Sequence, residues 1–101
     1  MKQISQRQTL ISDYATAVSH PIRVAILEMI EQAGELSFGA IFDQLPLAKA
    51  TVSQHITELK NAGLIAARSE GARVFYSIDA ETWRMARVLM GDFFGGIVPE
   101  E

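Results

Sequence analysis

The chain has 101 residues, 49% of them hydrophobic, and a formal net charge of −3 at pH 7. This length and composition support one domain with one hydrophobic core and exclude extensive disorder. The chain has no cysteine, which excludes disulfides, thiolate metal sites and thiol chemistry. No apolar run approaches the roughly 18 residues that a membrane span needs, and the polar first residues do not resemble a signal peptide, so we expect a cytoplasmic protein.

Two helices are predicted in the first third of the chain. Residues 8–18 have an apolar arc wide enough to cover more than one neighbour, and we expect part of it to contact a second copy. Pro21 suits the first turn of the next helix, residues 21–33, because its missing N–H is not needed there. The following residues 35–37 are too few for more than a single extended bridge.

A short helix over residues 38–45 and a longer one over residues 49–62, joined by a tight turn at Pro46, predict a helix-turn-helix. In the longer helix Val52, Ile56 and Leu59 recur at i, i+4 and i+7, so they form one stripe facing the core. The opposite face is short, polar and nearly free of acid, which suits contact with base edges. The predicted DNA contacts of this recognition helix are Lys49, Ala50, Thr51, Ser53, Gln54, His55, Thr57 and Lys60.

Three residues near these helices have two possible roles each. His55 either contacts base or phosphate or packs between the helix and the hairpin that follows. Arg23 either contacts phosphate or pairs with a glutamate of its own helix, Glu28 or Glu31. His20 fits the start of a helix better than a metal ligand.

A β-hairpin is predicted directly after Gly63, which can take the left-handed conformation that ends the recognition helix. Its strands are residues 64–69 and 73–78, and the second alternates apolar and polar positions as a half-buried strand does. Arg68 and Arg73 flank the turn. A basic hairpin in this position indicates a wing, residues 64–78, that contacts the phosphate backbone or a minor groove.

The last predicted helix covers residues 80–94, is N-capped by Asp79 and is apolar nearly all round. We expect nothing else in the chain to cover this helix, and a second copy is the natural cover. A small-molecule pocket on this face is the less favoured alternative. The predicted dimer interface comprises Leu10, Ile11, Tyr14 and Val18 of the first helix with Trp83, Ala86, Leu89, Met90 and Phe93 of the last.

Charge is unevenly distributed along the chain. Residues 46–78 carry four basic and two acidic side chains, whereas the remainder carries five basic and ten acidic ones. The predicted contact surface is therefore locally positive on an acidic body. This distribution permits nucleic-acid binding, although binders usually show an overall basic excess.

Three segments carry a family resemblance: SHPIRVAIL (19–27), ATVSQHITELKNAGLI (50–65) and RSEGARVFYSI (68–78). In order and spacing they resemble the ArsR-type winged helix-turn-helix repressors of prokaryotes. The resemblance implies a mainly α fold of about five helices with a two-stranded β-wing, forming one domain over residues 1–101. It also implies a homodimer, held by the first and last helices, that binds a palindromic operator. By position, Thr51, Ser53, Gln54 and His55 match the family's base- and phosphate-contacting stretch, and Arg73 matches a wing arginine.

The chain departs from the metal-sensing members of that family. Their cysteine pattern ELCVCDL corresponds here to GELSFGAIF (34–42), and the last helix has no histidine. Since soft and borderline metals prefer thiolate or imidazole, we predict no metal, no cofactor and no metal response. Ala48 also stands where relatives carry a serine or threonine N-cap.

We therefore predict a homodimeric transcriptional repressor that binds double-stranded DNA. We predict no enzymatic activity, since no catalytic constellation is apparent. The alternative is a winged-helix module that binds protein instead of DNA. A small-molecule or protein effector is left open, as are the operator and the regulated genes.

Overall fold

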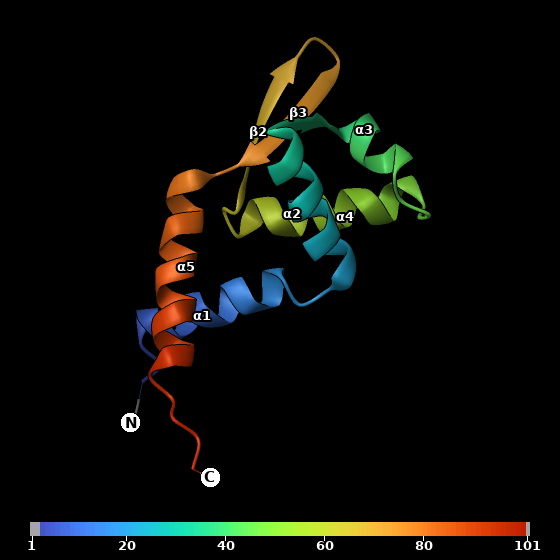
Figure 1. Ribbon diagram of the computed structural model, residues 1–101. Helices are drawn as coiled ribbons and strands as arrows, with labels where there is room; N and C mark the ends of the chain where they lie inside the picture. Colours follow the sequence, from blue (N-terminus) through green and yellow to red (C-terminus); the bar gives the residue numbers. More distant parts are fainter. Residues whose placement is uncertain (1–2, 101) are drawn as a thin grey trace.

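The computed structural model describes residues 3–100. Within this range the elements are α1 (Gln6–Ala17), α2 (Pro21–Ala33), β1 (Glu35–Ser37), α3 (Phe38–Asp43), α4 (Lys49–Asn61), β2 (Ile65–Glu70), β3 (Arg73–Ile78) and α5 (Ala80–Gly95) (Figure 1). The predicted element types and their order are confirmed. The hairpin of β2 and β3 projects at one end of the molecule, and α1 and α5 cross at the other (Figure 1).

The sheet has one strand more than the two-stranded wing that the sequence predicts. Its order is β1-β3-β2, and all pairs are antiparallel. β1 pairs fully with β3, with Glu35 opposite Ser77 and Ser37 opposite Phe75. A three-residue strand has no periodicity of its own, and the expectation of a single bridge was wrong for that reason.

Local capping sets the helix boundaries. Ser5 and Gln8 form a reciprocal capping box, which starts α1 two residues earlier than predicted. At the end of α4 the N–H of Gly63 (φ +79°) donates to Lys60 O and the N–H of Leu64 to Leu59 O. This is a Schellman motif, and it turns the chain from α4 directly into β2. The predicted cap by Asp79 and the predicted place of His20 at a helix start are also confirmed, since the two side chains accept from Thr82 N and Ile22 N.

The core lies between α2, α3, α4 and the inner face of the sheet. Its fully buried side chains are Ile26, Ile30, Ile41, Val52, Leu59 and Leu64. The predicted α4 stripe of Val52, Ile56 and Leu59 is therefore confirmed, and it fixes which face of α4 is presented outward.

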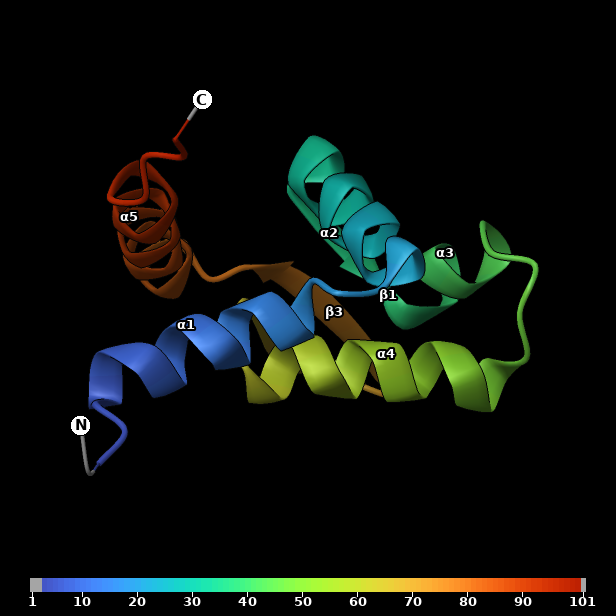
Figure 2. The ribbon, with the colours of Figure 1, turned by 90° about the horizontal axis from the view of Figure 1, so that it is seen from below.

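One side of α5 is covered by α1, so the expectation that nothing in the chain covers this helix was wrong. Ala86 is buried, and Leu89 and Met90 pack against the core cluster that includes Tyr14 of α1. Seen from below, α1 runs beside α4 (Figure 2), and Tyr14 in the second half of α1 donates to Met85 Sδ of α5 at 3.6 Å. Within residues 3–100, no helix has both the length and the apolarity to cross a membrane.

The start of α4 offers a stability test. Its N-cap is Ala48, whose methyl group cannot accept a hydrogen bond from the first amides of the helix. Ala48→Ser is expected to raise the free energy of unfolding by about 1 kcal/mol, measured by urea denaturation. An unchanged midpoint would show that these amides already have another partner.

Candidate nucleic-acid interface

The outward face of α4 is the main component of the candidate interface. Its exposed residues include Lys49, Ala50, Thr51, Ser53, Gln54, Thr57 and Lys60, all of them predicted contacts. Hydroxyl, amide and ammonium groups are the side chains that bond base edges and phosphates. The single acid on this helix, Glu58, lies toward its C-terminal end.

The start of α4 and the tip of the wing border a common groove. This groove, of about 610 Å³, is lined by α3, the β2–β3 turn and two cations, Lys49 and Arg73. The ammonium of Lys49 lies 5.9 Å from the ring centroid of Phe38. The fold therefore brings together two positive charges that are 24 residues apart in the chain.

His55 is turned inward, so we withdraw it as a direct base or phosphate contact. Its exposed fraction is 9%, and its Nδ1 accepts from Arg23 Nε at 3.1 Å. The ring of His20 lies 4.5 Å from that of His55, centroid to centroid. Of the two roles considered, packing within the protein is the one observed, and the neighbours shown are Arg23 of α2 and His20, the N-cap of that helix.

Arg23 links three helices instead of forming the ion pair considered above. Its Nε binds His55 of α4, and its Nη1 donates to Thr16 O of α1 at 3.2 Å. Neither Glu28 nor Glu31 is a salt-bridge partner of Arg23 among residues 3–100. Arg23 thus holds α1, α2 and α4 together, and it is half-buried beside the recognition helix.

The environment of His55 predicts pH-dependent stability. Burial lowers the pKa of His55 from its ordinary 6.5, and the nearby His20 and Arg23 lower it further. In the unfolded chain His55 takes up a proton near its ordinary pKa of 6.5, whereas in the folded chain it does so only at a lower pH. The free energy of unfolding should therefore fall as pH is lowered from about 6.5 toward the depressed pKa of His55. Above about pH 6.5, His55 should have no effect on the free energy of unfolding.

His55→Asn keeps an acceptor for Arg23 without a titrating ring. It should flatten the dependence of the urea midpoint on pH between neutrality and mild acid. A variant with the same pH dependence as the parent protein would assign the effect to another group.

The two wing arginines differ in their surroundings. Arg68 donates to both carboxylate oxygens of Glu35, at 2.7 and 3.2 Å, and to Glu70 at 3.1 Å. These bonds raise the pKa of Arg68 and lower that of Glu35. Arg73 has its guanidinium 5.0 Å from the ring centroid of Phe75 and forms no salt bridge with any residue in the range 3–100.

Sequence reasoning missed Glu35 and Phe75 as members of this site. The alternation of side chains along β3 could have identified Phe75, because this residue alternates with the inward Val74 and Tyr76 and shares a face with Arg73. Glu35 could not be found, because its proximity to Arg68 depends on the pairing of β1 with β3.

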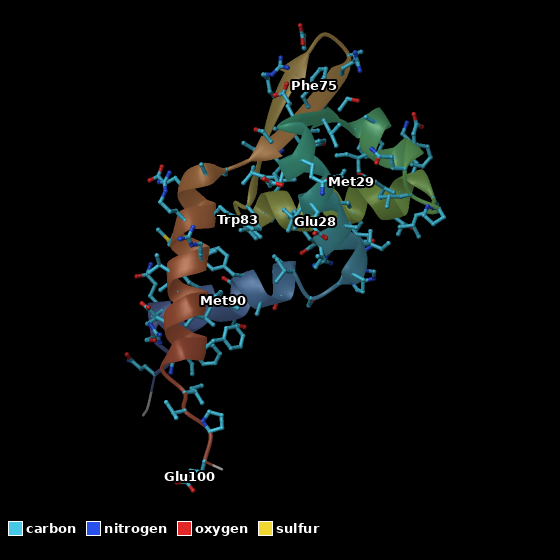
Figure 3. All side chains as sticks on the ribbon, in the orientation of Figure 1. Glu28, Met29, Phe75, Trp83, Met90 and Glu100 are labelled. Atoms are coloured by element: carbon cyan, nitrogen blue, oxygen red, sulfur yellow. The ribbon has the colours of Figure 1, made fainter. Side chains whose placement is uncertain are left out.

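The predicted dimer residues fall into two groups. Ile11, Tyr14 and Ala86 are buried within the single chain, at 8%, 6% and 9% exposure, and have little surface left for a partner. Trp83 and Phe93 are exposed at 38% and 37%, while Leu10, Val18, Leu89 and Met90 are half-buried. Trp83 and Met90 border an apolar groove of about 260 Å³ between α1 and α5, and Figure 3 shows both on α5.

No group of three or more His, Cys, Asp or Glu side chains in residues 3–100 is placed to hold a metal ion. The two histidines instead bond protein groups, Ile22 N and Arg23 Nε. The absence of a metal response nevertheless stays a prediction.

These features define a winged helix-turn-helix protein. The family model for a helix-turn-helix domain matches residues 18–68. Among curated proteins, the HTH-type transcriptional regulator YgaV of Escherichia coli K12 is 31% identical over 84 residues, covering 80% of this chain and 85% of its own. The transcriptional repressor SdpR of Bacillus subtilis 168 is 28% identical over 82 residues, covering 75% and 90%.

Solved structures share the same fold. An ArsR-like transcriptional regulator from Rhodococcus sp. RHA1 superposes with a TM-score of 0.74 at 17% identity, covering 87% of this chain and 82% of that one. The chain belongs to the helix-turn-helix family of transcriptional regulators, whose members bind DNA, and it shares its fold with ArsR-family regulators. The alternative of a protein-binding module receives no support from these comparisons.

Proposed function

We propose that the protein is a homodimeric repressor that binds a palindromic operator in double-stranded DNA, and that it acts in the cytoplasm. The observation that carries this proposal is the outward face of α4, where seven polar or small exposed residues project beside a wing that supplies Arg73. Each α4 would enter a major groove, and each wing would contact the flanking backbone. The name of the relative SdpR, a transcriptional repressor, supports repression.

A second copy of the chain is the proposed cover for α5. Its exposed apolar side chains include Trp83, Met85, Val88, Phe93 and Phe94, and exposed apolar side chains gathered on one helix are typical of a protein contact. A two-fold dimer covers one such patch with another. It also pairs two recognition helices, which a palindrome requires.

The signal to which the repressor responds is proposed not to be a metal. The sequence has no cysteine, and both histidines accept hydrogen bonds from protein groups. The nature of any effector, whether a small molecule or a protein, is left open by this proposal.

The dependence of binding on salt tests the proposed function. Each phosphate neutralised in the complex contributes about 0.9 to the slope of log K against log salt. Two copies of Lys49, Lys60 and Arg73 predict a slope of several units, measured by fluorescence anisotropy on a duplex selected from random DNA by the purified protein. A slope near zero would contradict a backbone-contacting DNA interface.

A further inference from the structure

The outer face of the wing sheet holds a compact cluster of charges around one aromatic ring. The guanidinium of Arg68 lies 4.7 Å from the ring centroid of Phe75, and that of Arg73 lies 5.0 Å from it. Phe75 is labelled on the hairpin in Figure 3. The two arginines flanking the turn therefore share one ring.

Strand pairing brings a distant carboxylate onto this cluster. Glu35 of β1 stands opposite Ser77, and Arg68 of β2 stands opposite Phe75, with β3 between them. The Arg68–Glu35 pair thus reaches diagonally across β3 and ties the hairpin to β1. Its bidentate form, at 2.7 and 3.2 Å, is the strongest geometry for an arginine and a carboxylate.

Arg68 is therefore already paired with carboxylates in the protein without DNA. Its Nε, Nη1 and Nη2 each donate to a carboxylate oxygen, and two acidic side chains face its single positive charge. Turning Arg68 toward a phosphate would leave Glu35 and Glu70 unpaired beside that phosphate, where like charges repel. Arg73 carries no such constraint among the described residues, because neither salt bridge found there involves it.

We propose that Glu35 sets the DNA affinity of the wing by holding Arg68 away from the backbone, so that of the two wing arginines Arg73 alone contacts phosphate. Glu35 is thus a restraining residue, and Arg68 is a positioning residue that becomes a DNA contact only when Glu35 is removed. The inference rests on the proposed function, since it assumes that the wing meets DNA. It differs from the sequence-based expectation that both arginines contact DNA.

The test compares the slope of log K against log salt for operator binding by three variants. Each expected change in slope is given per chain of the dimer. Glu35→Gln should tighten binding and steepen the slope by about 0.9, because Arg68 gains a phosphate. The double variant E35Q/R68Q removes both charges, keeps the net charge and should leave the slope of the parent protein unchanged. Arg73→Gln should flatten the slope by about 0.9.

Glu70→Gln is the matched control for E35Q. It removes the same charge from the wing but leaves the bidentate pair intact, so it should steepen the slope less than E35Q does. A double variant E35Q/R68Q that flattens the slope as much as R73Q would overturn the proposal, because Arg68 would then contact phosphate in the native complex. So would an E35Q variant that binds as the parent protein does.

Failure of the underlying function would look different. In that case R73Q would also leave affinity and slope unchanged, and the wing itself would not be a DNA contact. Thermal unfolding of each variant, expected near the midpoint of the parent protein, separates lost contacts from lost folding.

Discussion

Replacing Gln54 by alanine is expected to weaken operator binding by roughly fivefold to 150-fold for each half-site, because a bidentate amide–base contact is worth about 1–3 kcal/mol. Gln54 is exposed on the outward face of α4, two residues beyond the buried Val52 that anchors this helix. Its side chain makes no hydrogen bond to another group of residues 3–100, so the substitution removes nothing from the fold. Binding is measured by fluorescence anisotropy and folding by urea denaturation.

The matched control is Gln32→Ala. Gln32 is an exposed glutamine at the C-terminal end of α2, outside the candidate interface. It should bind the operator as the parent protein does. Equal affinities for Q54A, Q32A and the parent protein would remove Gln54 from the set of base contacts.

Placing a charge on the outer surface of α5 is expected to have the largest effect of all. Phe93→Glu should give a folded monomer, because 37% of this side chain is exposed in the single chain and a buried carboxylate at the dimer interface lacks a partner. Loss of the second recognition helix should reduce operator affinity by about 10²- to 10⁴-fold, the usual gain from two linked contacts. Light scattering after size-exclusion chromatography measures the mass, and anisotropy measures the affinity.

Val24→Glu provides the control for this substitution. Val24 is an apolar residue of α2 with 42% exposure, and it is outside α1 and α5. The V24E protein should remain a dimer with the affinity of the parent protein. An F93E protein that is still dimeric and binds normally would place the subunit interface elsewhere.

The sequence predicted the extent of α4 and its buried face well because the signals for both are local. Helical period identified the buried stripe of α4, and Gly63 marked its end, where a positive φ is needed. The same period held information that was overlooked. His55 is in phase with Val52, Ile56 and Leu59, which places it inward, yet its polar character suggested a contact with DNA.

Contacts between distant segments could not be predicted in this way. The covering of α5 by α1 joins the two ends of the chain, and the Arg68–Glu35 pair depends on which residue of β1 stands opposite β3. Neither arrangement leaves a periodic pattern in the sequence. Both change the assignment of individual residues, since Tyr14 becomes core and Arg68 becomes a paired charge.

Selection of operator sequences from a random duplex library by the purified protein tests the central claim most directly. A dimer with two copies of α4 predicts enrichment of an inverted repeat whose half-sites lie about one helical turn (~34 Å) apart, or a multiple of it, bound by two chains per duplex. Enrichment should be lost with Q54A and with F93E. Recovery of no common sequence, or of a single half-site occupied by one chain, would contradict a homodimer that reads a palindrome.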